Sequence, residues 1–225
     1  MTSLLLHPAD LLRSRTIPLA ERNPWRAVAE LALLVVVFGL AYGTVMGTYA
    51  GPQGPRVTQM VYSAAKVPLL LLLTFAISLP SFFVLNTLMG VRDDFGNAVR
   101  ALVATQAALT IILASLAPLT AVWYVSVAGY RHAILFNALM FGIASVAAQF
   151  LLRRLYRPLI ERNPKHRLLL RAWLVVFAFV GIQMGWVLRP FIGNPRGATT
   201  FFRAGAWGNA YVEVAGMIRE VLGLR

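Results

Sequence analysis

The chain has 225 residues, of which 59% are hydrophobic and only 13% charged, and its mean hydropathy of +0.70 excludes an ordinary soluble domain. It contains no cysteine, which excludes disulfides, thiolate metal sites and cysteine nucleophiles. The net charge of +13 does not indicate a nucleic-acid partner, because the cations fall in short segments between apolar runs and no DNA-binding or RNA-binding motif accompanies them.

Five apolar runs can cross a membrane, for which about 20 mainly apolar residues are needed. In chain order they cover 31–48, 67–91, 101–127, 133–152 and 172–188, and Leu168, Leu169 and Leu170 extend the last one. The sequence therefore predicts an all-α polytopic bundle of five transmembrane helices. Its expected parts are an N-terminal segment (1–26), a transmembrane domain (27–190) and an aromatic-rich interfacial tail (191–225).

Basic residues predict the orientation, because short loops rich in lysine and arginine stay in the cytoplasm. The loop between the fourth and fifth spans carries seven cations: Arg153, Arg154, Arg157, Arg162, Lys165, Arg167 and Arg171. We expect this loop and the N-terminus in the cytoplasm of a bacterium, the spans in its inner membrane, and the C-terminal tail outside. The same cations are candidates for binding anionic lipid headgroups or an acidic partner, although topology alone also explains them.

A seven-residue repeat precedes two of the spans. Residues 18–24 (PLAERNP) recur at 158–164 (PLIERNP) with one difference. Copies that enter the membrane from the same side must run in the same direction, which holds for the first and fifth of five spans. Asparagine before proline is restricted to extended geometry, so Asn23 and Asn163 should each end one segment and let the next helix start. We interpret the repeat as a structural motif, with half of a transport site as the alternative.

Glycines four residues apart let membrane helices approach closely. The first span has Gly39, Gly43 and Gly47 in series, and the fifth has Gly181 and Gly185. We predict that both sets are helix-packing or oligomer interfaces. The three-glycine series is the best candidate for self-association.

The spans hold almost no ionisable residues, which are the usual marks of ion paths and catalysis in membranes. Lys66 and Arg100 lie close enough to predicted span ends to reach the interface. Neutral polar residues remain at depth, and four of them are candidates for lining a narrow path: Asn86, Gln106, Asn137 and Gln183. The alternative is that they join neighbouring helices by hydrogen bonds.

Catalytic and metal-binding patterns are not found in the sequence. His7, His132 and His166 lie in three different segments, and the adjacent Asp93 and Asp94 are expected to cap a helix or to pair with Arg92 or Arg100. No metalloprotease, hydrolase or phosphate-binding motif occurs. We therefore expect no enzyme activity, no metal and no cofactor.

The C-terminal tail has two parts. Residues 189–207 are rich in glycine, proline and aromatic residues, which favours an ordered segment at the outer membrane interface. From Tyr211 onward, Val214, Ile218, Val221 and Leu222 fall at helical spacing. This pattern predicts a short amphipathic helix that lies on the membrane or on a partner's helix.

The order of five spans after a cytoplasmic N-terminal segment, and the stretch from Lys66, Val67 and Pro68 to Asn86, resemble the Yip1-type membrane proteins. Eukaryotic members of that family assist vesicle trafficking and bind small GTPases, but no functional motif of theirs can be placed on this sequence. The resemblance implies a non-enzymatic membrane scaffold.

These features lead to one hypothesis and one alternative. The hypothesis is a non-catalytic membrane protein that acts by assembly, as a homo-oligomer or as a subunit or scaffold of a larger membrane complex. The alternative is a small channel or transporter for an ion or small solute, formed within or between protomers. Convergence of the four polar candidates on one face would favour the alternative.

Overall fold

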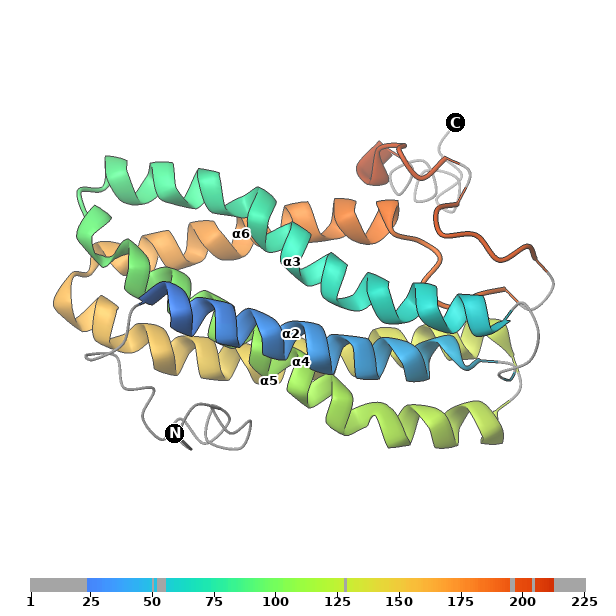
Figure 1. The fold of residues 1–225 in the computed structure, drawn as a ribbon. Helices are drawn as coiled ribbons and strands as arrows, with labels where there is room; N and C mark the ends of the chain where they lie inside the picture. The colour runs from blue at the N-terminus through green and yellow to red at the C-terminus, as the bar shows by residue number, and fades with distance from the viewer. Residues whose placement is uncertain are drawn as a thin grey trace, which may run out of the picture.

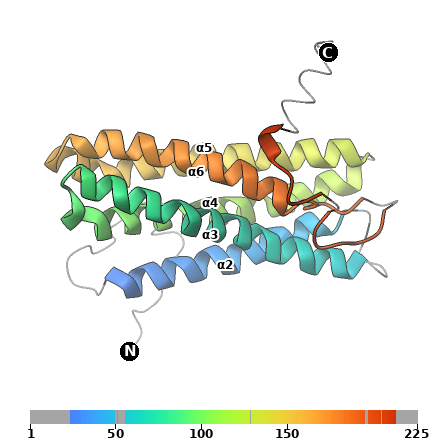
Figure 2. The same ribbon diagram turned by 90° about the horizontal axis from the view of Figure 1, so that it is seen from above.

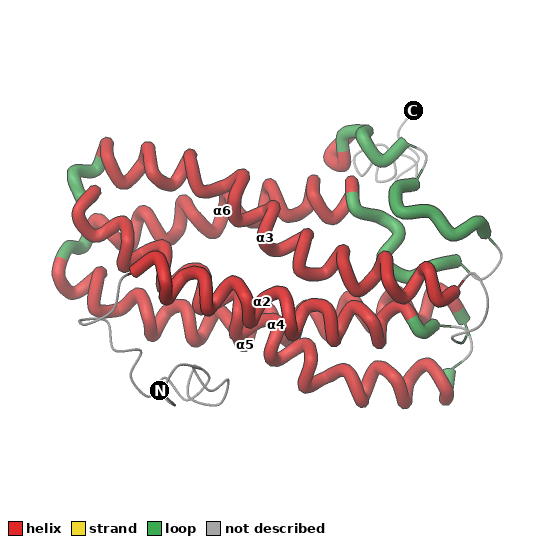
Figure 3. The backbone as a smooth tube through the Cα atoms, viewed as in Figure 1, coloured by secondary structure: helices red, strands yellow, loops and turns green. Residues whose placement is uncertain are grey.

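The computed structural model describes residues 24–49, 51, 56–127, 129–194, 197–203 and 205–212. Its described residues form helices joined by turns and loops, without strands (Figure 3). The elements are α2 (Pro24–Gly47), α3 (Arg56–Leu88), the 3-10 helix η1 (Arg92–Asp94), α4 (Phe95–Ser126), α5 (Tyr130–Arg162) and α6 (Lys165–Val187). The predicted all-α bundle is confirmed. The predicted amphipathic helix falls almost wholly on residues 213–225, outside the described part.

Five helices are long and apolar enough to cross a membrane, which makes the chain an integral membrane protein. The helices are longer than the apolar runs predict. Both α3 and α5 have 33 residues, or about 50 Å at about 1.5 Å per residue, whereas the hydrocarbon core is about 30 Å thick. They therefore extend beyond it.

The helix α4 is the centre of the bundle. It packs against α2 on one side and α5 on the other, while α3 packs against α2 and α6. Figure 2 shows α4 between α2 and α5. Of the apolar stretch of α4, 67% is buried, compared with 17% for α6. Small residues make this position possible, because Ala98, Ala104, Ala107 and Ala108 are completely buried and let the neighbouring helices approach.

The two ends of the bundle differ in sequence. The basic end holds the α3–α4 and α5–α6 turns, and the tail end holds the end of α2, the start of α3, the end of α4 and the start of α5, together with the described residues that follow α6 (Figure 1). At the basic end, Asn163 has extended geometry (φ −146°, ψ 115°) and Pro164 caps the start of α6. The role predicted for the second Asn-Pro is therefore confirmed. The first repeat lies outside the described residues except for Pro24, the first residue of α2.

The three-glycine series of α2 faces α3 of the same chain. A Cβ atom added to Gly39 would lie 3.2 Å from Pro68, one at Gly43 would lie 2.7 Å from the Ala64 Cα, and one at Gly47 would lie 2.6 Å from the Met60 Cα. The backbones of the two helices thus touch along three turns. The series that we expected to serve self-association is occupied by an internal contact.

Replacing Gly43 by leucine should destabilise the monomer. The new side chain would meet the backbone of α3, and overpacking of this kind costs about 1–3 kcal/mol or more. The matched control is Gly142→Leu on α5, where an added Cβ finds no atom within 4 Å. Thermal unfolding in detergent should show a lower midpoint for Gly43→Leu alone, and equal midpoints for both variants would contradict the internal contact.

Candidate functional site

The four polar candidates reach separate neighbours. Asn86 donates to the Phe82 carbonyl of its own helix at 2.8 Å. Gln183 donates to the Gly208 carbonyl at 3.1 Å and accepts from the Ala210 N–H at 3.0 Å, so it holds the described tail against α6. The Asn137 side chain lies among α2, α4 and α5, and Gln106 lies in a cleft between α4, α5 and α6. The four side chains do not line one path through this chain.

Asn137 is the centre of a network that joins three helices. The Tyr42 hydroxyl of α2 donates to Asn137 Oδ1 at 2.9 Å. The Asn137 amide donates to the Tyr124 hydroxyl of α4 at 2.6 Å and to the Ala133 carbonyl of α5 at 2.8 Å. Its side chain is thus satisfied by the protein itself. In a medium that offers no hydrogen bonds, this network fixes α5 on α2 and α4.

Gln106 lies in a cleft between α4, α5 and α6. The helices α5 and α6 diverge from their turn at the basic end, as Figure 1 shows, and a recess of about 440 Å³ remains between them. Thr105, Gln106, Ser145, Gln149 and Gly181 are among its lining residues. The Gln106 Oε1 atom is buried and has no hydrogen-bond partner. The cleft therefore combines polar groups with small side chains on a flank of the bundle.

The glycines of α6 do not form a tight contact within the chain. A Cβ added to Gly181 would meet only the Thr74 methyl group at 3.5 Å, an ordinary distance. One added to Gly185 would meet no atom within 4 Å. The predicted packing role of this pair is thus not fulfilled by any described neighbour, and Gly181 instead borders the cleft.

A polar face of α3 holds the segment that follows α6, residues 189–193, which we call the strap. Lys66 Nζ donates to the Pro190 carbonyl at 2.6 Å. The Ser63 hydroxyl donates to the Phe191 carbonyl, as does the Gln59 amide at 3.3 Å. From α5, the Tyr130 hydroxyl donates to the Ile192 carbonyl at 3.0 Å. Three consecutive carbonyls of the strap are bound in this way.

Lys66 lies elsewhere than the sequence predicted, because its side chain holds the strap. We expected this lysine near the start of the second span, free to reach the interface, but α3 begins at Arg56 and the Lys66 side chain is completely buried. The aromatic ring of Phe201 covers its ammonium group at 4.8 Å. The sequence contained a usable signal, since Gln59, Ser63 and Lys66 are spaced by four and three residues and so share one helical face.

The basic loop contacts Asp94, the last residue of η1, through one exposed and one buried side chain. Asp94 pairs with Arg162 at 2.8 Å and with the His166 Nε2 atom at 3.2 Å, and the His166 side chain is 0% exposed. We had expected Asp94 to cap a helix or to pair with Arg92 or Arg100. Asp94 does occupy the N-cap position of α4, but its side chain forms no cap hydrogen bond, and its ionic partners come from the α5–α6 turn instead of from Arg92 or Arg100. His166 was missed as a structural residue.

The remaining cations of this loop lie on the surface. Arg157 forms an exposed pair with Glu161 at 2.7 Å, which contributes little to stability. Lys165 donates to the Met89 carbonyl at 2.9 Å. The exposed cations of the group are Arg153, Arg154, Arg157, Arg162, Lys165, Arg167 and Arg171. Together they make the basic end a positively charged surface. In the described part of the chain, no three His, Asp or Glu side chains gather as metal ligands would.

Comparison with known proteins assigns the chain to no family. No protein-family model, no curated protein and no solved structure matches the chain. The likeness to Yip1-type proteins therefore stays a prediction, and function must be argued from the geometry described above.

Asn137 and Asn86 offer a matched test of the hydrogen-bond network. Asn137→Leu should destabilise the fold by about 1–2 kcal/mol, because hydrogen bonds between membrane helices average about 0.6 kcal/mol and the hydroxyls of Tyr42 and Tyr124 each lose one. Asn86→Leu should be neutral or stabilising, because its amide bonds only its own helix and its buried Oδ1 has no partner.

Both variants would be compared by thermal unfolding in the same detergent. The reverse order of stabilities would show that Asn137 does not hold the three helices together.

Proposed function

We propose that the protein is a non-catalytic membrane protein that acts by assembly, as a homo-oligomer or as a subunit or scaffold of a larger membrane complex. The helix that docks would occupy the cleft between α4, α5 and α6. The proposal includes a bacterial inner membrane, with the basic end and the N-terminus in the cytoplasm and the tail end outside.

The cleft is the observation that carries this proposal. Lipid chains can fill a recess, but they offer no hydrogen bonds to its polar lining residues Gln106, Ser145 and Gln149. A transmembrane helix can do both, since it brings polar side chains together with packing contacts. Ala178 and Gly181 line the cleft from α6 and are small, so the backbone of a docking helix can approach α6 closely there. The cleft thus has the chemistry of a contact between membrane helices that lacks one partner.

The charge distribution supports the orientation. Among the described residues, all four carboxylates lie at the basic end (Glu30, Asp93, Asp94 and Glu161), yet the cations there still outnumber them. Loops with such an excess stay in the cytoplasm. The exposed arginines of the α5–α6 region would also attract anionic headgroups, at about 1 kcal/mol each near the surface.

A pore between protomers is the alternative function. Within one chain, Asn86, Asn137 and Gln183 are used in internal contacts, which argues against a path through the monomer. Gln106, Ser145 and Gln149 all line the cleft, so two clefts facing each other would enclose polar side chains. A closed homo-oligomer that conducts ions after reconstitution would favour this alternative.

The test is native mass spectrometry of the protein extracted gently from its own membrane. Ala178→Trp places a large ring in the cleft from the exposed side of α6 and should remove the assembled species. Ala76→Trp makes the same change on the exposed side of α3, outside the cleft, and should leave the complex unchanged. A complex that persists in Ala178→Trp, or that disappears equally in both variants, would contradict docking at the cleft.

Gln106→Leu separates assembly from folding. It removes a buried acceptor that has no partner in the monomer, so thermal stability of the monomer should be equal or higher. The complex should nevertheless weaken, because the docking helix loses its polar contact. A variant that loses monomer stability and keeps the complex would refute the assigned role. The mass of the wild-type species distinguishes a second copy from a different subunit.

A further inference from the structure

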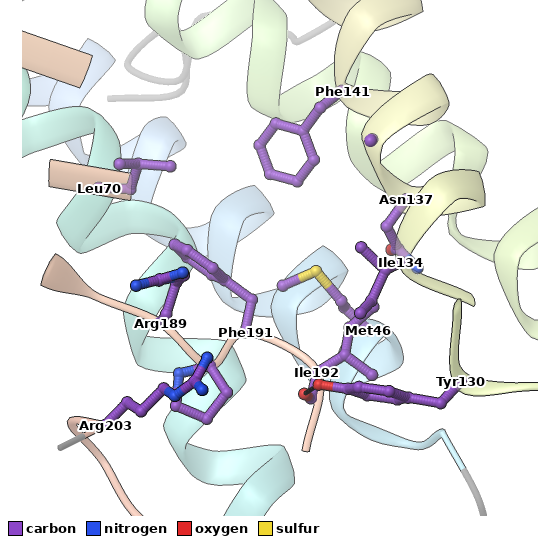
Figure 4. A pocket seen from close by; sticks show the side chains of 12 residues that line it. Met46, Leu70, Tyr130, Ile134, Asn137, Phe141, Arg189, Phe191, Ile192 and Arg203 are labelled. Carbon is purple, nitrogen blue, oxygen red and sulfur yellow. Dashed lines mark hydrogen bonds between the residues drawn. The ribbon is translucent and has the colours of Figure 1, made fainter. Parts of the chain in front are cut away.

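A second recess follows the cleft along α5 towards the tail end. Its volume is about 550 Å³, and side chains of α2, α3 and α5 line it together with the strap. Figure 4 shows Leu70 of α3 on one side of this recess and Ile134 of α5 on the other. We call the cleft and this recess together the groove.

One face of α5 lines the groove from end to end. Residues three and four positions apart lie on the same side of a helix, and the lining residues of α5 with this spacing are Ile134, Ala138, Phe141, Ser145, Gln149 and Leu152. From Ile134 to Leu152 the helix rises about 27 Å at about 1.5 Å per residue. The hydrocarbon core is about 30 Å thick. The length of the groove therefore fits a transmembrane helix.

The opposite wall of the groove is formed by α6 and then by the strap. Ala178 and Gly181 of α6 line the cleft, and residues 189–192 line the second recess. Gly185 is four residues beyond Gly181 and so shares its face of α6. A Cβ atom added to Gly185 would meet no atom within 4 Å. Ala178, Gly181 and Gly185 thus form a small-residue face that a second backbone can approach closely.

The cleft half of the groove offers polar contacts to an occupant. Gln106 lines it, is only 7% exposed, and has a side-chain oxygen without a partner among the described residues. Ser145 and Gln149 add a hydroxyl and a second amide. These groups can all donate hydrogen bonds, so a helix whose backbone carbonyls are accessible would suit them.

Accessible backbone carbonyls are a property of α6 itself. Small side chains leave the carbonyl oxygens of a helix uncovered, and each of these oxygens can accept a second hydrogen bond. The α6 backbone already accepts one, because the Tyr211 hydroxyl donates to the Phe179 carbonyl. The α6 helix of another copy therefore has both the small side chains and the acceptors that the cleft half requires.

Exposure and charge also favour a second copy. Only 17% of the apolar stretch of α6 is buried, the lowest share among the five described spans. Its 23 residues, about 34 Å at about 1.5 Å per residue, cover the length of the groove. No described lining residue of the cleft is charged, so two identical copies would not repel each other there.

Membrane orientation makes such a contact symmetric. Copies of one chain enter the membrane in the same direction, so a two-fold axis along the membrane normal places two α6 helices parallel to each other. Each α6 is then a wall of its own groove and the occupant of the other. Parallel helices that meet through small residues are a common form of association in membranes.

We propose that the groove is the interface of a two-fold dimer, in which α6 of a second copy lies along the groove and the small-residue faces of the two α6 helices meet. This inference rests on the proposed function, since it takes assembly at the cleft as given. It adds the identity of the docking helix and extends the contact from the cleft to the strap.

The test is cysteine cross-linking of the full chain in its own membrane. The chain contains no cysteine, so each introduced cysteine reports a single position. Ala178→Cys and Gly185→Cys should give disulfide-linked dimers on oxidation, because a disulfide needs Cα atoms within about 7 Å of each other. The control is Ile77→Cys, which is 51% exposed on α3 outside the groove and should stay unlinked. Absence of dimers from both α6 variants, or equal dimers from the control, would overturn the proposal.

A tryptophan pair tests how far the contact extends. Ala138→Trp fills the second recess from α5 and should weaken the dimer at least about tenfold, as overpacking of an interface predicts. Leu139→Trp adds a ring at the neighbouring position, which is 56% exposed and does not line the groove, and should leave the dimer intact. Native mass spectrometry measures both. A dimer that tolerates Ala138→Trp would overturn the extension to the strap.

The outcomes separate this inference from the proposed function. A complex with a different subunit that is lost in Ala178→Trp, without cysteine-linked dimers, would keep assembly at the cleft and overturn the second copy as its occupant. A complex that persists in Ala178→Trp would contradict both.

Discussion

The hydrocarbon core of a membrane offers no hydrogen bonds, and this constraint governs how the polar residues of the bundle are used. Short polar side chains return to their own helix, as Thr105 does with the Ala101 carbonyl and Ser115 with the Ile111 carbonyl. Longer ones reach across the bundle. Asn137 joins α5 to α2 and α4, Gln183 holds the described tail, and Lys66 holds the strap. The arrangement of the helices depends on these few contacts as well as on packing.

Some exceptions to this rule lie beside α6. The buried hydroxyl oxygens of Thr74 and Ser78 on α3, and the Gln106 Oε1 atom on α4, have no partners. Gly181 of α6 lies beside Thr74 and also borders the cleft that contains Gln106. By contrast, α2 touches the α3 backbone along three glycines. The bundle thus has a tightly packed side, between α2 and α3, and a loosely packed one, beside α6.

Hydropathy alone predicted the number of helices, because five apolar runs separated by basic or glycine-rich segments leave little choice. It misplaced the start of α3, since Gln59, Ser63 and Lys66 interrupt the apolar pattern where the helix turns a polar face to the strap. A polar stretch in the sequence of a membrane protein resembles a loop as long as the hydrogen-bond partners of its side chains are unknown. The Pro190 carbonyl that Lys66 binds is 124 positions away, beyond any local pattern.

The sequence could not identify which helix or residue each of its interaction motifs contacts. The series Gly39, Gly43 and Gly47 correctly indicated a close helix contact, but a motif of small residues is the same whether the other helix belongs to the same chain or to another. Asp94 likewise had charged neighbours in sequence, yet it pairs with Arg162, 68 positions away. In both cases the residue types predicted the kind of interaction, and only the fold identified the partner.

The helix α5 borders two recesses in the surface of the bundle. This helix rests mainly on α4, through the stacked rings of Trp123 and Phe136 at 4.4 Å and the Asn137 network near the tail end. Ser145 and Gln149 line the cleft, whereas Ile134 and Ala138 line the recess of about 550 Å³ between α3 and α5 nearer the tail end. The contacts with α4 therefore hold α5 in place beside two recesses that its own bundle leaves open.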